Sequence, residues 1–203
     1  VALDIAKAFD RVWHENLLAK LESYGIHEET ICWLNSYLGN RSFRVVVDGT
    51  FSNEFHTNSG VPQGSVLSPT LFLLYINDLL KSTANPIHSF ADDSTLHATH
   101  CYSSQNSDER RAERNSIVSS MNDDLYKIMK WGERNSVNFN ASKTQLCEIS
   151  RLKHKVIEKE ITFALTPLKK NSSVRLLGLN ISSNLLWHDH IMDIAKQAAK
   201  KIG

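Results

Sequence analysis

Five stretches of the chain place apolar residues three or four positions apart, the spacing that lines one face of a helix. The predicted helices cover residues 14–24, 28–38, 68–80, 117–131 and 188–202. Gly25 and Gly39 follow the first two helices, and glycine is common just beyond a helix end. Ser68 is expected to cap the third helix, with Pro69 in its first turn.

Short runs of β-branched and aromatic residues predict strands between these helices. Asp48-Gly49 lies between two such runs and tolerates the positive φ values of a tight turn, so a hairpin is expected around it. A second hairpin is expected around Asp92-Asp93. The predicted strands cover residues 1–4, 43–47, 51–57, 87–91, 94–98, 145–149, 161–165 and 174–181.

Residues 101–116 contain almost no apolar side chain and are predicted to be a polar connection. The helices and short strands follow one another in irregular order. They lack the repeated strand-helix-strand period of a doubly wound parallel sheet. The pattern therefore predicts an α+β fold.

The composition narrows the class of protein. The chain has 203 residues, 41% hydrophobic and 22% charged, which is enough apolar material for the core of one globular domain. Its 23 Lys and Arg nearly balance its 22 Asp and Glu, which excludes a strongly basic architectural protein. Any nucleic acid would therefore have to be held locally.

Three scattered cysteines, Cys32, Cys101 and Cys147, argue against a disulfide framework or structural zinc. A reducing, intracellular location in the cytoplasm or nucleus is expected. No apolar run reaches the length of about 18 residues that a membrane span needs, so no membrane contact is expected. The chain opens on VALDIAKAFD without Met or a leader, and we expect a piece of a longer polypeptide.

Two sequence motifs place acidic side chains at the ends of predicted strands. DIAKAFD places Asp4 after a predicted strand, where a helix cap is the ordinary alternative, and FADD places Asp92 and Asp93 at a hairpin tip. At an effective dielectric near 20, two carboxylates about 5 Å apart repel by roughly 3 kcal/mol, and a bound cation relieves this repulsion. Oxygen ligands without nearby imidazole or thiolate favour Mg²⁺. Asp123-Asp124, in contrast, is predicted to lie on the solvated face of a helix.

SGVPQGSVLSP, over residues 59–69, is the most specific string. Gly60 and Gly64 flank Pro62-Gln63 and bring bare backbone and one amide side chain to a surface just before a helix. For this composition the chance expectation of GxPQG is on the order of 0.0001. A simple turn would explain the glycines but not the amide and its fixed spacing.

In this order, DIAKAFD, SGVPQGSVLSP and FADD resemble the palm of reverse transcriptases. LNSYLGNRSFRVVVDG, LFLLYINDL, NASKTQ and VRLLGLNI extend the resemblance to the non-LTR (LINE-like, jockey-type) retrotransposon polymerases. The resemblance implies a right-hand polymerase palm of the α+β class, with a small antiparallel sheet packed on helices and with fingers and thumb largely missing. Residues 1–203 would then be one reverse transcriptase domain fragment that ends at the start of the thumb.

The resemblance implies catalytic roles for four side chains. Asp4, Asp92 and Asp93 would hold two Mg²⁺ ions together with the backbone carbonyl of Ile5. Lys143 would protonate the leaving pyrophosphate, with a surface lysine after a turn as the ordinary alternative.

Four further residues would bind the nucleotide. Phe9 would lie under the sugar and select deoxynucleotides by clashing with a 2′-hydroxyl, or else be an ordinary core aromatic. Gln63 would meet the incoming nucleotide near the templating base, with Pro62 and Gly64 shaping its loop.

The implied function is RNA-directed DNA polymerisation, the addition of deoxynucleotides to the 3′-hydroxyl of a primer. Leu177-Gly178 would belong to a hairpin that grips the primer. The partners would be an RNA template, a DNA primer, deoxynucleoside triphosphates and the rest of a parent polyprotein, with fingers, thumb and possibly an endonuclease. A catalytically silent relic, a nucleic-acid binding module, a group II intron-type reverse transcriptase and another two-metal phosphotransferase, such as a nucleotidyl cyclase, remain alternatives. The isolated fragment is expected to fold without polymerising, because the parts that orient its substrates are absent.

Overall fold

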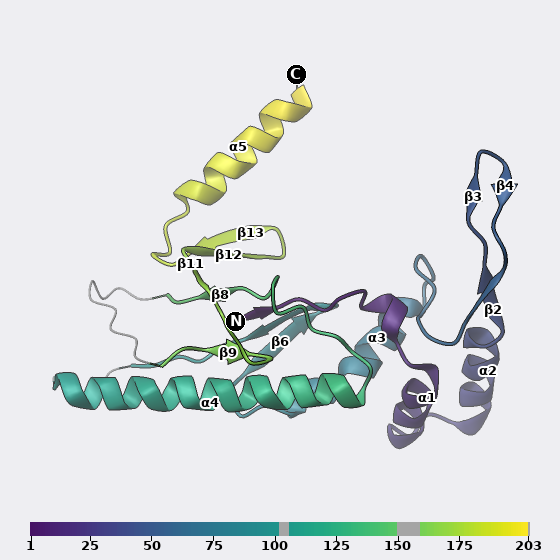
Figure 1. Ribbon diagram of the computed structural model, residues 1–203, viewed down its shortest axis with the longest axis horizontal. Helices are drawn as coiled ribbons and strands as arrows, with labels where there is room; N and C mark the ends of the chain where they lie inside the picture. The colour runs from purple at the N-terminus through teal and green to yellow at the C-terminus, as the bar shows by residue number, and fades with distance from the viewer. Residues whose placement is uncertain (102–105, 150–158, 203) are drawn as a thin grey trace. The chain divides into compact units, whose positions relative to one another are not determined.

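The computed structural model of the chain describes residues 1–101, 106–149 and 159–202 (Figure 1). These residues divide into two compact units. The helical unit comprises residues 6–81 and 131–138, and the sheet unit comprises residues 1–5, 82–130 and the described part of 139–203. Both units combine helices with short strands, which agrees with the predicted mixture of the two.

Helices form most of the helical unit. Its elements, in chain order, are the 3-10 helix η1 (Phe9–Arg11), α1 (His14–Ser23), α2 (Glu28–Leu38), β2 (Arg41–Phe43), β3 (Val46–Val47), β4 (Thr50–Phe51), β5 (Phe55–Thr57), α3 (Ser68–Ile76) and the 3-10 helix η2 (Leu79–Lys81). The buried side chains of α1, α2 and α3 form its core: Leu17, Leu21, Leu34, Leu38, Leu71, Phe72, Tyr75 and Ile76. These residues occupy the apolar helix faces that the sequence predicts.

The predicted hairpin around Asp48-Gly49 is confirmed. β2 pairs with β5 and β3 pairs with β4, both antiparallel, so the two chain segments run side by side to the tip (Figure 1). The tip needs two consecutive residues at positive φ, and Asp48 and Gly49 have φ values of 48° and 78°.

The start of α3 differs from the prediction. Leu67 stands at the cap position in helical conformation, and no side chain caps the helix. The hydroxyl of Ser68 instead donates a hydrogen bond of 2.6 Å to the carbonyl of Pro62. Ser68 is buried, so its hydroxyl is used to hold the preceding loop against the helix.

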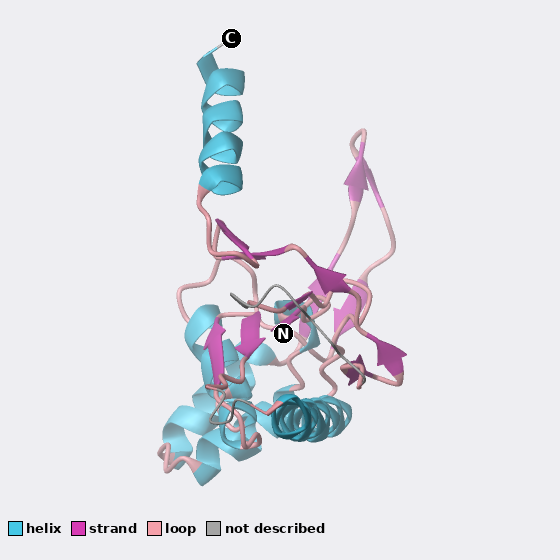
Figure 2. Ribbon diagram, turned by 90° about the vertical axis from the view of Figure 1, so that its left-hand side faces the viewer, coloured by secondary structure: helices cyan, strands magenta, loops and turns pink. Residues whose placement is uncertain are grey.

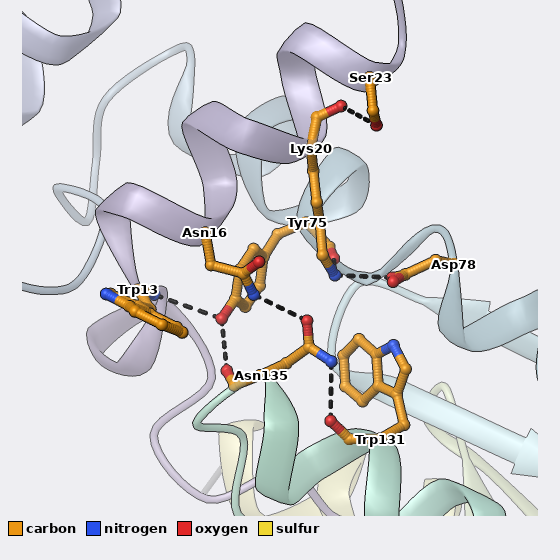
Figure 3. A network of polar contacts seen from close by, with 8 residues as sticks. All are labelled: Trp13, Asn16, Lys20, Ser23, Tyr75, Asp78, Trp131 and Asn135. Carbon is orange, nitrogen blue, oxygen red and sulfur yellow. Dashed lines mark hydrogen bonds and ion pairs between the residues drawn. The ribbon is translucent and has the colours of Figure 1, made fainter.

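A polar network links α1, α3 and residues 131–135 within the helical unit (Figure 3). The hydroxyl of Tyr75 donates to the backbone carbonyl of Asn135, and the Asn16 amide donates to the Asn135 side chain at 2.8 Å. The Lys20 ammonium donates to the Tyr75 carbonyl at 2.7 Å and lies 5.0 Å from the centre of the Trp131 ring. Burial lowers the pKa of Lys20 and raises the pKa of Tyr75, since each charged form is disfavoured there.

The sheet unit contains several small sheets and two helices. Its elements are β1 (Ala2–Leu3), β6 (Ile87–Phe90), β7 (Asp93–Leu96), most of α4 (Ser107–Arg134), β8 (Leu146–Cys147), β9 (Thr162–Phe163), β10 (Thr166–Pro167), β11 (Lys170–Asn171), β12 (Ser173–Leu176), β13 (Leu179–Ser182) and α5 (His188–Ile202). The largest sheet is antiparallel, in the order β1-β7-β6. α4 lies lengthwise below the strands in Figure 1 and is seen end-on in Figure 2, and it contributes Val118, Met121, Leu125 and Ile128 to the core.

The polar connection predicted over 101–116 is wrong for its second half, because α4 already begins at Ser107. The Asn106 side chain accepts a hydrogen bond of 3.0 Å from the Asp108 amide and caps the helix. Ion pairs then replace apolar packing in the first turns: Arg114 contacts Glu148, and Glu113 lies 3.0 Å from His100. The absence of an apolar stripe therefore hid this part of the helix.

The remaining elements of the sheet unit follow the sequence prediction only in part, since the strands predicted over 145–149 and 161–165 are shorter and β10 and β11 were not predicted. α5 covers His188–Ile202, as predicted, and the run over 174–181 folds into the β12–β13 hairpin. Leu177 and Gly178 form its turn, with φ values of 47° and 84°. Among the described residues, no helix combines the length and the hydropathy needed to cross a membrane.

Candidate active site: an acidic edge and a glycine-rich loop

The register of the three-stranded sheet brings the predicted acids to one edge. β1 pairs with β7 through Ala2↔Thr95 and Leu3↔Ser94, so Asp4 directly follows the last paired residue of β1 and Asp93 directly precedes its partner Ser94. β7 pairs with β6 through Phe90↔Asp93, so Asp92 stands in the turn beside them. We call Asp4, Asp92 and Asp93 the acidic edge.

Burial along the strands shows which face carries the acids. Leu3 and Ser94 are buried and face each other, and Ile5 is buried as well. Since side chains alternate between the faces of a strand, Asp4 and Asp93 share the opposite face. Asp4 is half-buried and Asp93 is exposed.

The turn of this hairpin lies one residue earlier than predicted. It consists of Ala91 and Asp92, and Asp93 is already the first residue of β7. Ala91 has a φ of 52°, in the left-handed region that residues with a side chain rarely adopt. Below the turn, the hydroxyls of Ser89 and Ser94 lie 2.6 Å apart and link the two strands.

The carboxylates of the acidic edge interact electrostatically. Burial raises the pKa of Asp93, and the negative charges of Asp92 and Asp4 raise this pKa further. Within residues 1–101, 106–149 and 159–202, no three His, Cys, Asp or Glu side chains form a cluster that could already hold a metal ion. The acids therefore lie close enough to repel one another without forming a closed ligand set.

The other side of the segment that carries Asp4 is held by residues 139–145. The Asn140 amide donates to the Asp4 carbonyl at 2.8 Å, and Ala2 and Gln145 exchange two backbone hydrogen bonds of 2.8 and 2.9 Å. Ile5, the next residue, forms an isolated antiparallel bridge with Phe139. Residues 139–145 therefore hold the backbone of Ala2, Asp4 and Ile5.

Lys143 lies in the turn that begins at Asn140. The Lys143 amide donates to the Asn140 carbonyl at 3.1 Å, and the Asn140 side chain accepts hydrogen bonds from the amide and hydroxyl of Ser142. The Lys143 side chain is exposed. The turn is thus joined to Asp4 through one backbone hydrogen bond, with its lysine pointing into solvent.

The glycine-rich loop over residues 59–64, in the helical unit, is bound along the segment that follows DIAKA. The Gly60 amide donates to the Val12 carbonyl and the Val61 amide to the Phe9 carbonyl, both at 2.8 Å. Gly60 has a φ of 92°, and a Cβ atom there would lie 3.0 Å from the Asp10 carbonyl oxygen. Only glycine fits this position without displacing backbone.

Gln63 is exposed and joins the loop to Asp10. Its amide nitrogen donates to the Asp10 carboxylate at 3.1 Å. The neighbouring Pro62 carbonyl accepts the hydrogen bond from the Ser68 hydroxyl. Gly64 has a φ of 87° and open space around its Cβ position. The loop is therefore fixed at Gly60 and Pro62, and it presents Gln63 and Gly64 to solvent.

Phe9 is half-buried next to this loop. Its ring stacks on that of buried Phe72, with centroids 4.9 Å apart and planes inclined by 20°. Phe9 is thus supported by the core of the helical unit and keeps part of its surface accessible. Both predicted roles, a core aromatic and a residue under a sugar, fit this placement.

Comparison with known proteins identifies the family. Residues 1–181 match the family model described as reverse transcriptase (RNA-dependent DNA polymerase). The chain belongs to the reverse transcriptase family. The resemblance drawn from its motifs is therefore confirmed.

Relatives of this reverse transcriptase chain come from non-LTR mobile elements. It is 29% identical over 206 residues to a probable RNA-directed DNA polymerase from transposon X-element of Drosophila melanogaster, covering 98% of the chain and 21% of that protein. It is 28% identical over 200 residues to the RNA-directed DNA polymerase from mobile element jockey of the same species, again covering 98% of the chain and 21% of that protein. The chain thus spans about a fifth of the length of these relatives.

The predicted site residues of the reverse transcriptase chain divide between its two units. Asp4, Ile5, Asp92, Asp93 and Lys143 belong to the sheet unit. The four predicted nucleotide-binding residues belong to the helical unit: Phe9, Pro62, Gln63 and Gly64. Within each unit the structure brings together residues that are far apart in sequence.

The predicted exposure of Asp123-Asp124 in this reverse transcriptase chain is wrong for Asp124. Asp124, expected on a solvated helix face, is fully buried, whereas its neighbour Asp123 is exposed. The sequence spacing already indicates burial, because Asp124 lies three residues after Met121 and four before Ile128 and so falls on the apolar face of α4.

Proposed function

We propose that this chain forms the palm of a retrotransposon RNA-directed DNA polymerase, which adds deoxynucleotides to the 3′-hydroxyl of a DNA primer on an RNA template. The observation that supports this proposal is the pairing of Leu3 with Ser94 and of Phe90 with Asp93, which brings Asp4, Asp92 and Asp93 to one end of the three-stranded sheet. Membership of the reverse transcriptase family and the names of the jockey and X-element relatives support it.

The acidic edge would hold two Mg²⁺ ions. Its donors are hard carboxylate oxygens, and burial together with the negative charges of Asp92 and Asp4 raises the pKa of Asp93. The backbone carbonyl of Ile5, next to Asp4, would complete the ligand set. Such ions would activate the primer hydroxyl and neutralise charge on the leaving pyrophosphate. The protein itself would fix the positions of the carboxylates through the β1-β7-β6 ladder.

The glycine-rich loop and Phe9 would contact the incoming nucleotide. Gln63 is exposed at the end of a loop that is fixed at its base, and its hydrogen bond to Asp10 orients the amide. Phe9, supported by Phe72, would lie under the sugar and disfavour a 2′-hydroxyl. Lys143, exposed in the turn after Asn140, would give a proton to the leaving pyrophosphate.

The longer protein to which such a chain belongs would supply the remaining contacts to template, primer and triphosphate. The chain spans about a fifth of its relatives' length, so most of the length of those proteins lies outside the matched region. The β12–β13 hairpin, with Leu177 and Gly178 at its turn, would hold the primer end.

Primer extension by the longer protein tests this function. The protein is incubated with a primed RNA, deoxynucleotides and Mg²⁺, and Asp92→Ala is compared with Asp123→Ala, an exposed aspartate outside the acidic edge. We expect extension to be lost in Asp92→Ala and kept in Asp123→Ala. Extension that survives Asp92→Ala would refute the catalytic assignment. A wild-type protein that binds the primed RNA without extending it would favour a silent relic or a binding module.

A further inference from the structure

Asp124 is a buried carboxylate whose two oxygens are fully engaged. It has an exposed fraction of 0%. One oxygen accepts hydrogen bonds of 2.9 Å from the Ala84 amide and the Lys127 ammonium. The other accepts hydrogen bonds of 2.7 and 2.8 Å from the amide and the side chain of Asn85. Burial by itself would raise the pKa of Asp124, but the hydrogen bonds that it accepts outweigh burial and hold this pKa below its ordinary value.

The segment that Asp124 binds leads directly into the acidic hairpin. Asn85 and Pro86 immediately precede β6, which begins at Ile87 and ends at the turn that carries Asp92. Pro86 also accepts a hydrogen bond of 3.0 Å from the His97 amide, just beyond the end of β7. The base of the hairpin is thus fixed on one side by α4 and on the other by its own ladder.

The register of this hairpin decides where the acids point. A slip of one residue in a strand moves every side chain to the other face of the sheet. A slip of β6 against β7 would re-form the turn and displace Asp92, whereas Asp93 is also held by the pairing of β7 with β1. The two-residue turn and the Ser89–Ser94 contact fix this register at one end of β6, and the hydrogen bonds from Ala84 and Asn85 to Asp124 fix the backbone at the other end, where β6 begins.

We propose that Asp124 is a positioning residue for the acidic edge: it holds the backbone of Ala84 and Asn85 and thereby sets the register of the hairpin that presents Asp92 and Asp93. This inference rests on the proposed polymerase function. Asp124 is fully buried and would act through the backbone of Ala84 and Asn85. Its neighbour Asp123 on the same helix is exposed, so it provides a matched control.

The test measures single-nucleotide addition by the full-length protein on a primed RNA at a series of Mg²⁺ concentrations. Asp124→Asn keeps the size of the side chain but replaces two acceptor oxygens by one and adds a donor. We expect kcat to fall about 10- to 100-fold, as is usual when a residue that orients metal ligands is lost. We expect a higher Mg²⁺ concentration at half-maximal rate, with the KM for the nucleotide changed less than about threefold. Asp123→Asn is expected to match the wild type in all three.

Asp92→Asn separates failure of this inference from failure of the proposed function. If Asp92→Asn remains active, the proposed function is wrong. If Asp92→Asn is inactive while Asp124→Asn folds and matches Asp123→Asn, the positioning role is wrong. Excess Mg²⁺ is expected to restore part of the activity of Asp124→Asn and none of the activity of Asp92→Asn.

Asn85→Ala keeps the inference testable if Asp124→Asn fails to fold. This change removes the side-chain hydrogen bonds of 2.8 Å to Asp124 and 2.9 Å to Ser120 but leaves both backbone donors in place. We expect a smaller fall in kcat, about three- to tenfold, with the same shift in Mg²⁺ dependence. A folded Asn85→Ala protein with wild-type kcat and wild-type Mg²⁺ dependence would overturn the proposal.

Discussion

Replacing Gly60 by alanine tests how tightly the glycine-rich loop is bound to its neighbouring segment. Alanine at a φ of 92° costs about 1–2 kcal/mol in backbone conformation. The new Cβ would also lie 3.0, 3.1 and 3.2 Å from three backbone atoms of Asp10, and relieving such overlap costs about 1–3 kcal/mol more. We therefore expect Gly60→Ala to lower the free energy of unfolding by about 3 kcal/mol, or the melting temperature by roughly 6–12 °C.

Gly64 provides the matched control for this prediction. It lies in the same loop at a φ of 87°, but nothing lies within 4 Å of its Cβ position. Gly64→Ala should therefore carry the conformational cost alone, about 1–2 kcal/mol. Denaturant unfolding of the two variants, followed by circular dichroism, gives the difference. Equal midpoints for Gly60→Ala and Gly64→Ala would show that the loop does not approach the Asp10 backbone as closely as described.

Three further predictions concern the acidic edge and the nucleotide. The folded state raises the pKa of Asp93 above its ordinary 3.8, so ionised Asp93 destabilises the fold at neutral pH. Asp93→Asn should therefore raise the melting temperature at pH 7. This gain should vanish as the pH falls towards 3.8, where Asp93 becomes protonated in both states. A gain that is independent of pH would contradict it. Phe9→Val should increase incorporation of ribonucleotides relative to deoxynucleotides about tenfold or more, and an unchanged ratio would make Phe9 a core aromatic only. Lys143→Ala should lower kcat about 100-fold in single-turnover addition, whereas a loss below threefold would make it an ordinary surface lysine.

Elements with a clear apolar period could be predicted from the sequence. α2 and α5 have the predicted bounds, and the hairpin around Asp48-Gly49 forms as expected, because local spacing and turn chemistry determine these elements. The first turns of α4 were missed because ion pairs with distant residues, such as Arg114 with Glu148, stabilise them in place of an apolar stripe. Such pairing partners cannot be derived from periodicity.

In the candidate site, too, local motifs could be predicted from the sequence, whereas features that depend on distant contacts could not. The motifs identified the acids and the loop, but the shift of the turn to Ala91-Asp92 depends on pairing between β6 and β7. The hydrogen bond between Gln63 and Asp10 also joins residues far apart in the chain. Asp124 was missed for a different reason: its position on the apolar face of α4 was visible, but a buried carboxylate is favourable only with donors that the fold supplies from Ala84 and Asn85.

Binding of Mn²⁺, as a spectroscopic substitute for Mg²⁺, tests the central claim that the acids from β1 and from the β6–β7 hairpin share metal ions. Its affinity for the full-length protein can be measured by electron paramagnetic resonance for the wild type, Asp4→Asn, Asp93→Asn and the double variant. If the two carboxylates hold the same ions, each single change should weaken binding at least tenfold, and the double variant should be scarcely weaker than either single one. Losses that simply multiply in the double variant, or single variants that bind Mn²⁺ as tightly as the wild type, would contradict a shared site at the acidic edge.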